Sequence, residues 1–114
     1  MKPIIRASIG PTAVAAGFLA LLPVAMAQED AARMALGRRV AETDCAQCHQ
    51  IDAKGEAGSA GAPSFEAVAN IRSMTELSIK VFLQSTHATM PMLHLSPSEL
   101  DGLGAYIMSL RRLP

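Results

Sequence analysis

The sequence is poor in large aromatic residues. Its 114 residues include no tryptophan, one tyrosine, three phenylalanines and only two cysteines. Phe18 lies in an apolar stretch near the N-terminus, so Phe65, Phe82 and Tyr106 are the large aromatic candidates for a core. A domain of this size buries a modest share of its surface. So few aromatic residues therefore indicate that a cofactor or a cross-link contributes to its stability.

Clusters of lysine and arginine are missing as well. Ten basic residues balance ten acidic ones, and only Lys54 and Lys80 are lysines beyond the N-terminal stretch. Nucleic-acid binding normally requires a clustered basic surface. We therefore expect no nucleic-acid partner.

Residues 50–70 also lack the alternation of apolar and polar residues that is typical of strands. Residues 50–70 are rich in glycine, alanine and serine, which indicates a loop with a short helical turn around residues 65–68. Helical patterns surround this loop. They predict a first helix over residues 30–44, a second from a capping box at residues 73–76 to Ser85, and a last one from a capping box at Ser96 through Leu110. The sequence therefore predicts an all-α fold.

The N-terminus has the pattern of a secretory signal peptide. Lys2 and Arg6 precede the apolar run AVAAGFLALL at residues 13–22, and Ala-Met-Ala at residues 25–27 fits a cleavage site. We expect residues 1–27 to be cleaved and residues 28–114 to form one periplasmic domain. A retained anchor is the alternative, although Pro23 leaves the run shorter than the roughly 20 residues that span a bilayer. Cleavage would leave eight basic and ten acidic residues. We expect the mature chain to be a monomer that is not stably inserted in a membrane.

The most informative motif is Cys-Ala-Gln-Cys-His at residues 45–49. Cys-x-x-Cys-His is the attachment signature of c-type haem, in which both thiols bind one porphyrin. The following His49 is then a candidate iron ligand. A disulfide between Cys45 and Cys48 or half of a zinc site are the alternatives, but no second ligand pair has a recognisable zinc spacing.

The second axial position of the iron has several candidates between the last two predicted helices. Met90 is favoured because Pro91 restricts its backbone to an extended conformation from which a thioether can reach the iron. Met92, His87 and His94 are the alternatives. The carbonyl of Pro63 is a candidate acceptor for the outer N–H of His49, which would orient the imidazole.

The motifs CAQCH, GAPSF, HATMP, LSPSEL and AYIMSL follow one another in this order. With them, the chain resembles small bacterial class I c-type cytochromes over residues 31–112. The resemblance implies the cytochrome c fold of about three main helices around one covalent haem, with ligands His49 and Met90 and support from Pro63. It also implies that the first and last helices cross, with Gly37 beneath Tyr106 or Ile107. The lysine-poor sequence departs from mitochondrial relatives, so their partners do not carry over.

These features predict a periplasmic electron carrier that is not an enzyme. Its expected partners are redox proteins, with a dehydrogenase as donor and an oxidase or reductase as acceptor. A haem subunit of an oxidoreductase complex is one alternative. A haem enzyme or gas-binding sensor, in which Met90 is easily displaced from the iron, is the other.

Overall fold

A computed structural model describes residues 22–56, 58–59, 61–86 and 89–112. The chain divides into two units, residues 1–30 and residues 31–114, which are described separately. In the first unit, the described residues from Leu22 onward are helical, and the side chains of residues 24–30 are exposed. Most of the predicted leader therefore lies outside the described residues, whereas its predicted cleavage site at residues 25–27 falls in this helical stretch.

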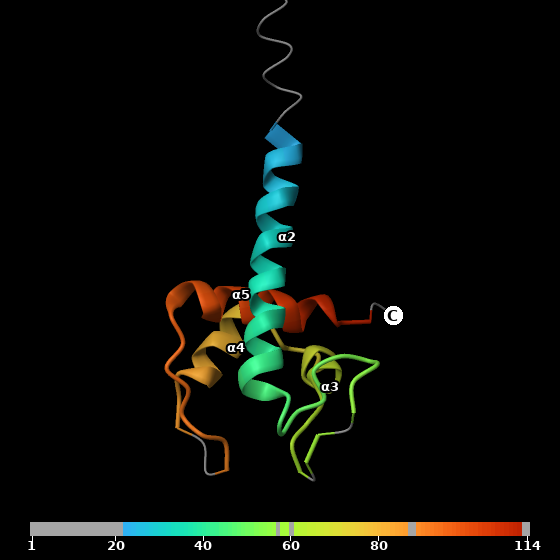
Figure 1. Cartoon of the computed structure of the whole chain (residues 1–114), viewed down its shortest axis with the longest axis vertical. Coiled ribbons are helices and arrows are strands. Elements are labelled where there is room, and N and C mark those ends of the chain that lie inside the picture. The colour runs from blue at the N-terminus through green and yellow to red at the C-terminus, as the bar shows by residue number, and fades with distance from the viewer. Residues whose placement is uncertain (1–21, 57, 60, 87–88, 113–114) are drawn as a thin grey trace, which may run out of the picture. The chain divides into compact units, whose positions relative to one another are not determined.

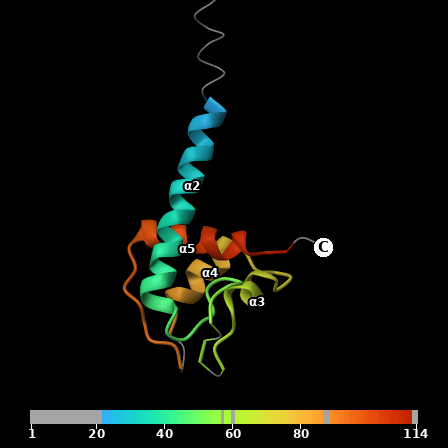
Figure 2. The same cartoon turned by 45° about the vertical axis from the view of Figure 1, so that its right-hand side comes forward.

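The described residues form helices and loops without strands, which confirms the all-α prediction. The described residues contain four α-helices. Figures 1 and 2 show the loops that connect them. The elements are α2 (Leu22–Val40), a π-helical turn (Ala41–Cys45), α3 (Phe65–Ala69), α4 (Glu76–Leu83) and α5 (Pro97–Ser109). None of the helices in this part of the chain has the length and apolar character needed to cross a lipid bilayer.

The first helix starts earlier than the sequence predicted, at Leu22 rather than at residue 30. Pro23 stands in the first turn, where a missing backbone N–H costs no hydrogen bond. At its other end the helix widens, and the N–H of Ala46 donates to the carbonyl of Ala41 at 3.0 Å, five residues back. The predicted helix therefore does reach Asp44, but from Ala41 onward it is a π-helical turn and not an α-helix.

Helices α2 and α5 meet at two glycines. A Cβ atom on Gly37 would lie 1.9 Å from the carbonyl oxygen of Gly102, so the two backbones touch directly. The helix crossing is the one expected from the sequence, but its partner differs. Gly37 faces the backbone of Gly102 and Leu103 rather than Tyr106 or Ile107, because backbone contact requires a second residue without a side chain.

The core of the second unit is built around α5, which packs against α3 and α4. Leu103 is fully buried at its centre. The aromatic residues Phe65 and Tyr106 are buried beside it, whereas Phe82 is half exposed on α4. The aliphatic residues of α5 therefore supply much of the apolar core, because few aromatic residues are available to do so.

Two helix ends show how polar side chains fix the loops. Ser96 and Glu99 cap α5 reciprocally, as predicted. The cap of α4 differs from the prediction: Thr75, not Ser73, is the N-cap, and Ser78 takes the place expected for Glu76. A hydroxyl at the third helical position can bond the N-cap N–H as a carboxylate does, so the box shifts by two residues.

Arg111 and Arg112 follow α5. Arg111 reaches away from this helix and holds the connection between α3 and α4. Its guanidinium donates to three backbone carbonyls, those of Ala69, Ile71 and Met74. Arg112 pairs with Glu66 on α3. The C-terminal segment therefore fixes the loop that positions α3.

Candidate functional site

Cys45 and Cys48 stand where the first helix ends. Cys45 closes the π-turn and is 5% exposed, whereas Cys48 is exposed. The N–H groups of Cys48 and His49 both donate to the carbonyl of Cys45, which folds the motif into a tight turn. Both cysteines are free thiols, so the disulfide alternative is not realised in this structure.

The two thiols have different surroundings. Burial, with a smaller contribution from the neighbouring Asp44 carboxylate, raises the pKa of Cys45 to about 11. In this structure the thiol of Cys45 is therefore protonated at neutral pH, and its burial limits its reactivity. A thiol can react with another molecule only if that molecule can reach it. The fold restricts access to the buried Cys45 far more than to the exposed Cys48.

His49 is held in one ring orientation. Its Nδ1 lies 2.7 Å from the carbonyl oxygen of Pro63, and because a carbonyl only accepts, Nδ1 is the protonated nitrogen. In the neutral imidazole, the lone pair is then on Nε2. The Phe65 ring packs against the imidazole at 5.5 Å between centroids. This is the arrangement in which an imidazole is prepared to bind a metal through Nε2.

Residues 63–65 are fixed in turn by the helix that follows them. Ser64 caps α3 by accepting from the N–H of Ala67. The N–H of Phe65, which α3 leaves unpaired in its first turn, donates to the carbonyl of Gln50 at 2.9 Å. The segment that accepts from His49 therefore begins a helix and is tied to the residue after His49.

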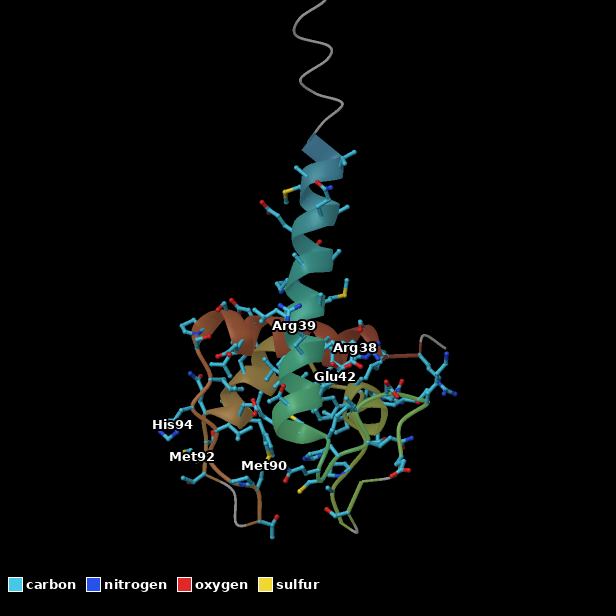
Figure 3. All side chains as sticks on the ribbon, viewed as in Figure 1. Arg38, Arg39, Glu42, Met90, Met92 and His94 are labelled. Carbon is cyan, nitrogen blue, oxygen red and sulfur yellow. The ribbon has the colours of Figure 1, made fainter. Side chains whose placement is uncertain are left out.

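The loop between α4 and α5 carries the candidate sulfur ligands. Met90 is partly buried, whereas Met92 is 52% exposed and His94 is exposed. Figure 3 shows the Met90 side chain on the inner side of this loop, and those of Met92 and His94 on its outer side. His87 lies outside the described residues. Of the three described candidates, Met90 is thus the one that faces the protein.

The described side chains fit a c-type haem better than a zinc ion. Among them, no three histidine, cysteine, aspartate or glutamate residues gather as a metal-binding group. What the structure offers instead is one imidazole with its outer nitrogen occupied, two neighbouring thiols and an inward thioether. Imidazole, thioether and thiol are the donors that attach and ligate haem.

Sequence reasoning missed three residues that organise this region. Tyr106 donates its hydroxyl to the carbonyl of Ile51 at 3.1 Å. Arg38 on α2 pairs with Asp52 at 3.3 Å, and Arg111 holds the α3–α4 connection. Only Tyr106 had a signal in the sequence, because a buried tyrosine needs a partner for its hydroxyl.

The fold and the donor set define a class of small helical proteins with one attached haem. Comparison with known proteins agrees, since the Cytochrome c family model matches residues 34–111. A cytochrome c-552 of Bradyrhizobium diazoefficiens is 40% identical over 76 residues, which are 66% of this chain and 72% of that protein. No solved structure matches the chain.

This chain belongs to the cytochrome c family. It is therefore a small bacterial-type electron-transfer haem protein with haem c attached covalently, and its exchange of electrons requires redox partners.

Proposed function

We propose that the chain is a periplasmic carrier of single electrons, not an enzyme, and that its iron ligands are His49 and Met90. The observation that carries the proposal is the 2.7 Å contact between His49 Nδ1 and the carbonyl of Pro63, which leaves Nε2 free for a metal. A filled pair of axial positions favours electron transfer over ligand chemistry.

Each residue of the site has one task in this proposal. Cys45 and Cys48 hold the cofactor through thioether bonds, and Pro63 orients His49 and raises its basicity. Met90 supplies a thioether that favours the reduced state. Bound haem supplies the chemistry of a one-electron change between Fe(III) and Fe(II). His49 and Met90 would hold the iron, and the hydrogen bond from His49 to Pro63 would keep the imidazole in place through that change.

The proposed location rests on the leader. Residues 1–27 would direct export and be removed, leaving residues 28–114 as a periplasmic monomer. In the described part of the chain, none of the helices has the length and apolar character to span a bilayer. A dehydrogenase as electron donor and an oxidase or reductase as acceptor complete the proposed role.

A mass spectrum of the native protein tests both parts. We expect the mass of residues 28–114 plus one haem. A mature mass without haem, after expression with a working haem-attachment system, would contradict the cofactor assignment. A haem-bearing mass that still includes residues 1–27 would contradict only the leader cleavage.

The rival functions differ in how tightly Met90 holds the iron. A haem enzyme or gas-binding sensor requires a free or weakly held axial position, so its reduced form binds carbon monoxide quickly. The carrier should bind carbon monoxide slowly and show the sulfur-to-iron band of the oxidised protein. A dedicated subunit of an oxidoreductase complex would share these spectra, but would co-purify with a dehydrogenase.

A further inference from the structure

The segment that follows the Cys-x-x-Cys motif is held at three successive residues. Two of the bonds come from residues 63–65, and the third comes from α5. The three bonds are His49 Nδ1 to Pro63 O at 2.7 Å, Phe65 N to Gln50 O at 2.9 Å, and Tyr106 Oη to Ile51 O at 3.1 Å. The position of His49 therefore depends on two parts of the protein that are far apart in sequence.

The bond from Tyr106 is buried at both ends. Tyr106 is 6% exposed and Ile51 is 8% exposed. Burial also raises the pKa of Tyr106 above its usual value, although the Arg38 charge opposes this. The hydroxyl thus stays protonated and donates at neutral pH. Little water reaches the Ile51 carbonyl, so loss of the donor would leave it unsatisfied.

The loop beyond Ile51 is tied to itself and cannot easily absorb a shift. The Asp52 carboxylate accepts from the N–H groups of Lys54 and Gly55, and the Gln50 side chain donates to the carbonyl of Gly55. Arg38 joins the same carboxylate to α2. A displacement at Ile51 would therefore pass to its other neighbours, Gln50 and His49.

We propose that Tyr106 is a positioning residue for His49, because its hydroxyl fixes the Ile51 carbonyl and thereby keeps the imidazole in its bond to Pro63. The inference rests on the proposed role of His49 as iron ligand. A weaker bond to Pro63 makes the imidazole a weaker electron donor. The oxidised iron then loses more stabilisation than the reduced iron, and the midpoint potential rises.

The Tyr106→Phe variant of the haem-loaded protein tests this role. It keeps the buried ring and removes only the hydroxyl. We expect the reduction equilibrium to shift about threefold toward the reduced form, which is about 28 mV at 59 mV per tenfold change for one electron. The nuclear magnetic resonance signal of the His49 Nδ1 proton should move as well. An unchanged potential and signal would overturn the proposal.

Arg111→Lys is the matched control. This variant also weakens hydrogen bonds from the α5 end to backbone carbonyls, but those bonds go to residues 69–74 and not to residues 49–51. It should lower the unfolding temperature and leave the potential and the His49 signal in place. If Arg111→Lys shifted the potential as much as Tyr106→Phe does, the effect of Tyr106 on the potential would reflect only its contribution to the stability of the whole fold.

A second measurement avoids the risk that Tyr106→Phe fails to fold. Tyr106 is the single tyrosine of the chain, so growth on 3-fluorotyrosine modifies this residue alone. The fluorinated hydroxyl is more acidic and a stronger donor, so the potential should move opposite to the Tyr106→Phe shift. A potential that does not fall would contradict the proposal.

The same spectra separate this inference from the proposed ligand role. If His49 binds the iron, its ring signals carry large paramagnetic shifts in the oxidised wild-type protein. Their absence would refute the ligand role. Their presence, together with a potential insensitive to Tyr106, would refute only the positioning role.

Discussion

At the scale of single residues, Met90 and Met92 are close in sequence but differ in their surroundings. Met90 faces the protein and Met92 faces outward with a 52% exposed side chain. We expect Met90→Ala to abolish the sulfur-to-iron band and to lower the potential, because the thioether favours Fe(II). Absorption spectra and a potentiometric titration would measure both effects.

Met92→Ala is the control at the neighbouring position. It removes a similar side chain from the same loop and should leave both the band and the potential nearly unchanged. The reverse pattern, with the band lost in Met92→Ala alone, would assign the ligand to Met92.

The carboxyl group of Glu99 makes the stability of the fold depend on pH. Hydrogen bonds from the hydroxyl and N–H of Ser96 lower the pKa of this carboxyl. The ionised form is thus favoured in the folded state. The contribution of Glu99 to the stability of the fold is fully present above the usual glutamate pKa. It is lost as the pH falls from that value through the lowered pKa of the folded state.

Glu99→Gln should therefore make stability less sensitive to pH across this acidic window. Unfolding temperatures measured over a series of acidic pH values would show a shallower decline than in the wild type. An equally steep decline in the variant would mean that other carboxylates cause it.

At the scale of elements, the start of α4 allows a test with two neighbouring hydroxyl residues. Thr75 is the N-cap, and its side chain accepts from the N–H of Ser78 at 3.0 Å. Thr75→Ala should cost about 1 kcal/mol of unfolding free energy, the usual value of an N-cap. Ser73→Ala should cost much less because Ser73 lies outside the helix. Denaturant unfolding of both variants would compare them, and equal losses would contradict the assigned cap.

The helix crossing allows a second test at this scale. Gly37→Ala places a Cβ against the backbone oxygen of Gly102, which cannot move aside as a side chain would. We expect a loss of about 3 kcal/mol, at the upper end of overpacking costs. Gly104→Ala on α5 is the control, since its Cβ would meet atoms at an ordinary 3.5 Å. Similar stabilities of the two variants would argue against a tight crossing.

These elements show what the sequence could and could not predict. The all-α fold, the short helix at Phe65 and the cap at Ser96 follow from local patterns, and all three are confirmed. The cap of α4 was misplaced because two overlapping hydroxyl patterns compete there, and local sequence does not decide between them. The contacts of Tyr106 and Arg111 join residues far apart in the chain, so no local pattern contains them.

The candidate site divides in the same way. The motif predicts roles for the cysteines, His49 and the Pro63 carbonyl, and these roles stay predictions, whereas the expected hydrogen bond between His49 and Pro63 is present. The choice of Met90 over Met92 remains a prediction that the inward orientation supports. Side-chain orientation in a loop depends on tertiary packing, which is why sequence alone left both residues open.

At the scale of the whole molecule, opposite charges nearly balance, and several charged side chains of the described residues form ion pairs. Arg33 binds Glu76, and Lys80 binds Asp101, whose pKa the lysine lowers. With the leader removed, eight basic residues would face ten acidic ones. The long-range field that steers charged partners is therefore weak.

We thus expect electron transfer to an anionic reagent such as ferricyanide to depend little on salt. Stopped-flow rates should rise less than about threefold between low and physiological ionic strength, since only weak repulsion is screened. A steep fall with added salt would instead reveal a basic docking surface.

The contact between Gly37 and Gly102 joins two segments that are far apart in sequence, so the fold around Cys45 is complete only when α2 and α5 have met. The complete fold buries Cys45. A chain in which the two helices have not yet met would leave this thiol more accessible, and we therefore expect haem attachment to precede closure of the crossing.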